Sequence, residues 1–152
     1  MDEEKYLILL EQAKSNERTQ IKIKEFDEKP ELEDFYRLID CEFIELAYPD
    51  KKREKNLSSA PLALVVDEEF LITHQDLNIN YLASFLRSPE GAAKPLPENI
   101  IFGNAVIIKI FADDDEFSYF TKEEAEAMAE KLEELNKVTP MIHIGQYLKR
   151  PF

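Results

Sequence analysis

The hydrophobic and polar residues of this chain repeat with two different periods, which predict a mixture of helices and strands. Apolar residues at helical spacing predict a first helix over residues 2–16, although the apolar run 7–10 also suits the start of a strand. Strict alternation over residues 20–24 predicts a half-exposed strand, with isoleucines on one face and lysines on the other. Pro30 is expected at the first position of a short helix, because its missing N–H costs nothing there, and an apolar stripe continues that helix to Ile39.

The middle of the chain predicts two further strands and one helix. Residues 41–48 are expected to form a strand, and the continuous apolar run 62–66 predicts a buried one. Residues 49–59, which lie between them, are polar and charged and are expected to be a connection. A helix is expected over residues 77–86, and the proline-rich segment 89–97 predicts a loop.

The C-terminal third contains the strongest strand signal and the clearest helix start. Residues 100–111 are almost continuously apolar, and Gly103 within them suggests a bulge or a close backbone approach. Thr121 and Glu124 match a capping box, which predicts a helix that continues to about Asn136. The residues expected on its buried face are Ala125, Met128, Ala129, Leu132 and Leu135.

This order of elements predicts an α+β fold, with a mixed, mainly antiparallel sheet packed against three to four helices. Strands and helices do not alternate regularly, so a parallel βαβ architecture is not expected. We expect a helical, acidic N-terminal extension over residues 1–20, a single α+β domain over residues 21–137 and a C-terminal tail over residues 138–152.

Composition narrows the classes of function. The 152 residues carry 19 Lys and Arg against 32 Asp and Glu, a formal net charge of −13. This excess of acid, most of it in residues 1–50, opposes direct binding to nucleic acid or to anionic membranes. The single cysteine, Cys41, excludes an intramolecular disulfide and a multi-cysteine zinc site. No signal-peptide or membrane-spanning pattern is present, so we expect a cytoplasmic monomer or homodimer.

The predicted C-terminal helix carries a strongly acidic face. One interpretation is a solvated surface, stabilised by pairs such as Glu133 with Lys137. The other is a phosphate-like array that binds a basic partner, because like charges at i,i+4 spacing otherwise destabilise a helix. The residues of this face are Glu123, Glu126, Glu130, Glu133 and Glu134.

A basic cluster in the middle of the chain allows a different function, the binding of a nucleotide-like ligand. Lysine and arginine side chains can bind phosphate, and tyrosine rings can stack on a base. The alternative is that the cluster balances nearby acids. The candidate phosphate ligands are Lys51, Lys52, Arg53 and Arg87, and the candidate stacking residues are Tyr48, Tyr81 and Tyr119.

Two further patterns are candidates for catalysis, each with a non-catalytic alternative. Carboxylates of the acidic string 113–116, such as Asp113 and Asp115, could bind a divalent cation, but the spacing does not match an EF-hand and a solvated turn is the alternative. Cys41 could pair with His74 or His143 as nucleophile and base, but no catalytic signature flanks it. Glycine-rich phosphate loops and nucleophile elbows are also absent, so we expect neither a catalytic residue nor a cofactor.

Several segments between residues 21 and 135 also carry a family resemblance. They are Pro30-Glu31, the strand 43–46, the strand 64–69, Asn80 at a helix start, Phe102-Gly103, and the segment from Phe117 to Glu124. Together they resemble a domain-of-unknown-function family of small proteins from phages and conjugative elements. The resemblance implies a compact α+β fold and a mobile-element origin, and it supplies no catalytic residue.

These observations lead to one expected function and two alternatives. We expect a non-enzymatic, acidic interaction protein of a phage or mobile element that binds a basic host protein. Inhibition of a nucleic-acid-binding defence protein by charge mimicry is a special case. The alternatives are a small-ligand binder that uses the basic cluster and a metal-dependent hydrolase that uses residues 113–116.

Overall fold

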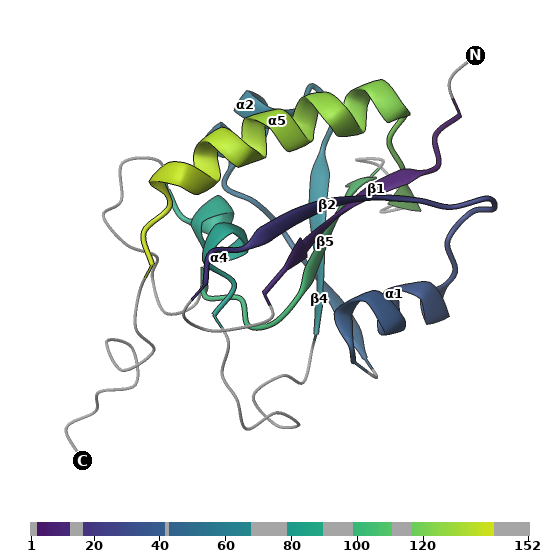
Figure 1. The fold of residues 1–152 in the computed structure, drawn as a ribbon, viewed down its shortest axis with the longest axis horizontal. Helices are drawn as coiled ribbons and strands as arrows, with labels where there is room; N and C mark the ends of the chain where they lie inside the picture. The colour runs from purple at the N-terminus through teal and green to yellow at the C-terminus, as the bar shows by residue number, and fades with distance from the viewer. Residues whose placement is uncertain are drawn as a thin grey trace.

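The computed structural model describes residues 3–12, 17–41, 43–67, 79–89, 99–110 and 117–141, and these contain a six-stranded sheet with four helices (Figure 1). Every described strand pairing is antiparallel, which confirms the α+β class and the mainly antiparallel sheet. The strand order is β2 (Gln20–Glu25), β1 (Tyr6–Glu11), β5 (Ala105–Ile110), β4 (Leu62–Asp67), β3 (Ile44–Ala47). A short strand, β6 (Phe117–Ser118), pairs with the end of β5.

Helices cover both faces of this sheet. Helix α1 (Leu32–Ile39) packs Phe35 and Ile39 onto one face. On the opposite face lie α2 (Lys51–Leu57), α4 (Tyr81–Arg87) and α5 (Lys122–Val138). In Figure 1, α5 and α2 lie on the upper side of the sheet and α1 on the lower side. Because both faces are buried, the three central strands are apolar at nearly every position and lack the alternation of a half-exposed strand.

The helix expected over residues 2–16 is wrong, because residues Tyr6–Glu11 form strand β1. This strand lies inside the sheet, paired with β2 on one edge and β5 on the other. Its apolar side chains from Leu7 to Leu10 alternate between the two cores, so all four are buried. A short, continuous run of apolar residues shows neither the helical nor the strand period. Such a run therefore does not by itself distinguish a buried strand from part of a buried helix.

Two other expectations about helices need correction. The connection expected over residues 49–59 contains helix α2, which begins after Asp50, whose carboxylate accepts hydrogen bonds from the amides of Lys52 and Arg53. Helix α1 does not begin at Pro30, because Glu31 is its N-cap. The helix expected over residues 77–86 is α4, which begins only at Tyr81, after its N-cap Asn80, and ends at Arg87; residues 77 and 78 lie outside the described residues.

The C-terminal elements agree closely with expectation. Both halves of the capping box are present: the hydroxyl of Thr121 accepts from the amide of Glu124 at 3.1 Å, and the carboxylate of Glu124 accepts from the amide of Thr121 at 2.9 Å. Ala125, Met128 and Leu132 are buried as expected, whereas Ala129 and Leu135 are only partly buried. The strand expected over 100–111 is shorter, since β5 begins at Ala105. No helix in the described ranges is both long and apolar enough to cross a membrane.

Candidate functional site

Helix α5 presents a continuous row of exposed carboxylates, here called the acidic stripe: Glu123, Glu126, Glu130, Glu133 and Glu134. At 3.6 residues per turn these side chains fall within about 100° of the helix circumference. The opposite side of α5, at Ala125, Met128 and Leu132, is buried in the core. The stripe therefore faces solvent along most of the length of the helix.

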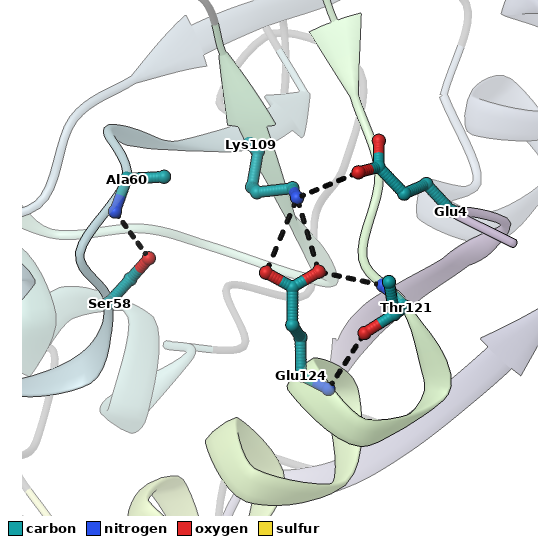
Figure 2. Close-up of polar contacts among 6 residues, drawn as sticks. All are labelled: Glu4, Ser58, Ala60, Lys109, Thr121 and Glu124. Atoms are coloured by element: carbon teal, nitrogen blue, oxygen red, sulfur yellow. Dashed lines mark hydrogen bonds and ion pairs between the residues drawn. The ribbon is translucent and has the colours of Figure 1, made fainter. Parts of the chain in front are cut away.

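The first turn of α5 is held to the sheet by Lys109 of β5. Its ammonium lies 3.2 Å from Oε1 of Glu124 and 3.8 Å from a carboxylate oxygen of Glu4 (Figure 2). The Lys109 side chain is only 12% exposed, and its ammonium lies 5.8 Å from the centre of the Phe120 ring. This is why a lysine interrupts the most apolar strand of the chain.

The same contacts set the protonation of Glu124. Partial burial by itself would raise the pKa of this carboxyl group. The hydrogen bond from the Thr121 amide and the contact with Lys109 outweigh burial, and the pKa lies below its usual value. Glu124 is therefore a structural carboxylate of the helix start and not a member of the acidic stripe.

The last turn of α5 is held by Arg18, in the connection that leads from β1 to β2. One guanidinium nitrogen, Nη1, donates to the carbonyl oxygens of Asn136 and Thr139, at 2.7 Å each. The side-chain amide of Asn136 donates to the carbonyl of Thr19, also at 2.7 Å. A cation at the C-terminal end of a helix also stabilises the helix dipole. The acidic stripe is thus presented by a helix that is anchored at both ends.

The acidic stripe contains few compensating charges. Lys137 pairs with Glu134 at 3.1 Å, so the expected pair of Lys137 with Glu133 is wrong. No other stripe residue makes an ion pair within the described ranges. Like charges at i,i+3 and i,i+4 positions, such as Glu126 with Glu130, face each other without a cation between them.

The basic cluster in α2 is divided between solvent and core. Lys51 and Lys52 are exposed, whereas Arg53 is only 7% exposed. The Arg53 side chain donates to the carbonyls of Ser88, at 2.7 Å, and Pro89, at 3.2 Å, and its guanidinium lies 3.9 Å from the centre of the Phe85 ring. Arg53 therefore caps the C-terminal end of α4, and this contact is structural.

The tyrosines proposed to stack on a ligand lie in different environments. Tyr48 is half exposed, whereas Tyr81 and Tyr119 are each 5% exposed and pack in separate apolar clusters. Burial raises the pKa of Tyr81, and burial together with the charge of Asp34 raises the pKa of Tyr119 to about 12. Arg87, at the end of α4, is partly buried. The backbone amide of Asp50 donates to the carbonyl of Leu86 at 2.8 Å, so the start of α2, with Lys51, Lys52 and Arg53, lies beside the end of α4, with Arg87. Tyr81 and Tyr119 belong to two other clusters, so the structure does not bring all members of this set together.

The remaining candidates are placed only in part. Asp113, Asp115 and the rest of the string 113–116, together with His74 and His143, lie outside the described residues. Within the described ranges, no group of three His, Cys, Asp or Glu residues is placed to hold a metal ion. Cys41 is partly buried, and burial, reinforced by the charge of Asp67, raises its pKa to about 11.

Comparison with known proteins identifies the family. A model described as a domain of unknown function, DUF3846, matches residues 8–133. The chain belongs to the DUF3846 family. No curated protein and no solved structure matches it. The DUF3846 match begins within β1 and reaches Glu133, so it includes most of the sheet and four of the five residues of the acidic stripe.

The DUF3846 match also includes a buried polar network that was not predicted from the sequence. Of its members, only Asn80, at a helix start, and Gly103, at a close backbone approach, stood out in the sequence. Asn80 is fully buried, and its side-chain amide donates to the carbonyls of Leu10, at 3.0 Å, and Gly103, at 2.8 Å. Its Oδ1 accepts from the amide of Ala83 and the hydroxyl of Thr19, each at 3.1 Å. Asn80 thus joins β1, α4 and the approach to β5, and its partners Leu10, Thr19 and Gly103 lie 23 to 70 positions away in the sequence.

The polar network continues to the edge of the sheet. The hydroxyl of Thr19 lies 2.7 Å from Oε1 of Gln12 and accepts from the amide of Leu82 at 3.1 Å. The backbone amide of Gln12 donates to Oδ1 of Asn104 at 3.0 Å. All of these groups have structural partners, so the network positions α4 and the start of β2 and leaves no reactive group exposed.

Proposed function

We propose that this DUF3846 protein is a non-enzymatic interaction protein that binds a basic partner through the acidic stripe of α5. The observation that carries this proposal is the stripe itself, five exposed glutamates on one side of a helix anchored at both ends. Electrostatic complementarity of this kind raises the association rate and makes binding sensitive to salt.

The charge density of the stripe supports nucleic-acid mimicry. From Glu123 to Glu134 the helix rises by about 17 Å, so the mean spacing along the axis is about 4 Å. Phosphates along one strand of a duplex repeat about every 3.4 Å. A partner groove that neutralises a phosphate strand therefore meets a similar row of charges on α5.

The cost of the stripe to the helix also supports a role in binding. Each close pair of like charges on a helix surface destabilises it by about 0.2–0.5 kcal/mol. A surface that serves only solubility can avoid this cost by interspersing lysines among the glutamates, as Lys137 does at the last turn.

We further propose that the protein belongs to a phage or other mobile element, and that its partner is a nucleic-acid-binding host protein of a defence system.

The test is charge reversal within the stripe, with a matched control elsewhere. The triple variant Glu123→Lys, Glu126→Lys and Glu130→Lys changes the formal net charge from −13 to −7. The control reverses three other exposed acids, Asp27, Glu28 and Glu33, and changes the net charge by the same amount. Both variants and the parent are used to capture proteins from a bacterial host lysate at low and high salt, and the captured proteins are identified by mass spectrometry.

We expect the parent and the control to capture the same basic protein at low salt and the stripe variant to lose it. Duplex DNA added as competitor should displace the captured protein, because mimicry requires a shared groove. Equal capture by the stripe variant and the control, or capture that DNA does not affect, would contradict the proposal.

A further inference from the structure

Strand β2 forms the outer edge of the described sheet, and its backbone groups can be assigned to one side or the other. The amide of Phe26 donates to the carbonyl of Lys5 at 3.0 Å, in register with the β1–β2 pairing. In an antiparallel ladder, hydrogen-bonded pairs alternate with non-bonded pairs. The N–H and C=O groups of Gln20, Lys22 and Lys24 therefore point toward β1. The corresponding groups of the residues between them point outward from the edge.

The first group that points outward, the backbone carbonyl of Thr19, already has a hydrogen-bond partner. The carbonyl of Thr19 accepts from the side-chain amide of Asn136, on the last turn of α5. Beyond this point the outward residues are Ile21, Ile23 and Glu25, and no described backbone or side-chain group hydrogen-bonds to their backbone. β2 thus presents three consecutive outward positions without a bulge or a proline.

The side chains along this edge differ between its two faces. Ile21 and Ile23 lie on the face covered by α5, and Ile23 is 38% exposed, which is high for an apolar residue in a strand. Lys22 and Lys24 lie on the opposite face. Lys22 pairs with Glu11 at 2.7 Å, whereas Lys24 makes no ion pair with a described residue. On this face of the edge, Lys24 is therefore a positive charge without a described ion pair. Glu25, which lies on the same face as Ile21 and Ile23, pairs with Lys5 at 3.0 Å.

This charge pattern disfavours a second copy of the chain in the symmetric registers that pair most of β2 with itself. In a symmetric antiparallel pair centred on Lys22 or Lys24, that lysine lies directly opposite its own copy. In a pair centred on Ile23, Lys22 lies opposite Lys24. Like charges directly opposite each other destabilise strand pairing, whereas opposite charges stabilise it.

We propose that the outer edge of β2 is a strand-addition site for an extended segment of a partner protein. The segment carries acidic side chains beside Lys22 and Lys24, and β-branched apolar side chains beside Ile21 and Ile23. Backbone hydrogen bonds supply most of the affinity in this mode of recognition, and alternate side chains supply the specificity. The site is separate from the acidic stripe and takes a partner of opposite charge, so it does not rest on the proposed function.

The test uses two synthetic peptides and two variants of the full chain. One eight-residue peptide alternates glutamate with valine, and the control peptide alternates lysine with valine. Ile23→Pro removes an outward N–H and leaves the pairs with β1 intact. Lys24→Glu reverses the free charge of the edge. Binding is followed by amide hydrogen exchange at Ile21, Ile23 and Glu25, and the oligomeric state by analytical ultracentrifugation.

We expect the acidic peptide to slow exchange at these three amides and the basic peptide to have no effect. Ile23→Pro should weaken binding at least about tenfold. Lys24→Glu should reverse the preference between the peptides, and this variant keeps the test decisive if Ile23→Pro fails to fold. Three outcomes would overturn the proposal: no change in exchange, amides already protected in the free monomer, or self-association through β2.

Discussion

The side-chain amide of Asn80 donates a hydrogen bond to the carbonyl oxygen of Gly103 at a distance of 2.8 Å. Asn80 is the N-cap of α4, and Gly103 lies two residues before β5, so this bond ties a helix start to the central sheet. Gly103 has a φ of 76°, in the left-handed region that favours glycine. Asn80 thus supplies a buried donor. The left-handed conformation of Gly103 brings its carbonyl oxygen to that donor.

Replacing Asn80 should destabilise the fold strongly. Asn80→Ala leaves the carbonyls of Leu10 and Gly103 without their donor, and we expect a loss of about 2–4 kcal/mol in the free energy of unfolding. Asn80→Asp keeps the helix-capping oxygen but not the donor, so it should also destabilise. Urea unfolding measures both effects. The control is Asn56→Ala on the exposed side of α2, which should change stability by less than about 0.5 kcal/mol.

Gly103 should tolerate substitution only by residues that accept positive φ. We expect Gly103→Ala to reduce the free energy of unfolding by about 1–2 kcal/mol, because a Cβ atom is strained in this conformation. Gly103→Asn should cost less, since asparagine adopts it more readily. Equal costs for the two variants, measured by thermal or urea unfolding, would show that the backbone conformation is not the cause.

Arg53 should act on stability and not as a ligand for phosphate. Arg53→Lys removes the bond of Nε to Ser88 and the stacking on Phe85, so we expect destabilisation by about 1–3 kcal/mol. Lys52→Met, at the exposed neighbouring position, should leave stability nearly unchanged. The measurement is urea unfolding of both variants. A thermal shift of the parent with nucleotides that Arg53→Lys abolishes without destabilising the protein would contradict this assignment.

Glu124 should make stability depend on acid pH. Its folded pKa is lowered, so its contribution is complete above its unfolded pKa, near 4.5, and is lost as the pH falls through the lower folded value. Glu124→Gln should therefore flatten the decline in stability below about pH 4.5. Unfolding free energies at several pH values test this. Glu123→Gln, one residue away and outside the capping box, should retain the slope of the parent.

Cys41 should react slowly with thiol reagents. With a pKa of about 11, only about one thiol in a thousand is ionised at pH 8, and the thiolate is the reactive form. We expect the rate of reaction with an aromatic disulfide to rise with pH up to about 11 and to increase sharply when urea unfolds the chain. Rapid labelling of the folded protein at pH 7 would exclude this environment.

The start of α5 and its buried face were predicted best, because both depend on residues close together in the sequence. The capping box of Thr121 and Glu124 lies within four residues, and the buried face of α5 repeats over a long helix. The acidic stripe could be located for the same reason, because helical spacing alone places its residues on one side. The apolar run of β4 was also recognisable as a buried strand.

The errors arose where distant parts of the chain determine the outcome. Residues Tyr6–Glu11 form a strand because β2 and β5 pair with both edges and cores cover both faces. The polar segment Lys51–Leu57 is a helix because Arg53 and Leu57 are buried against the rest of the fold. Lys137 pairs with Glu134 and not with Glu133. Side-chain geometry decides between them, and the spacing of charges along the sequence does not specify that geometry.

The sequence by itself determined the α+β class, the helix with its acidic stripe and the strong excess of negative charge, because period, capping and charge depend on neighbouring residues. Only the tertiary structure decided that β2 is an outer strand, that Arg53 serves α4 and that Arg18 and Lys109 hold the two ends of α5. The side-chain contacts among these join residues at least 15 positions apart, and burial and hydrogen bonding select them only when the whole sheet is assembled.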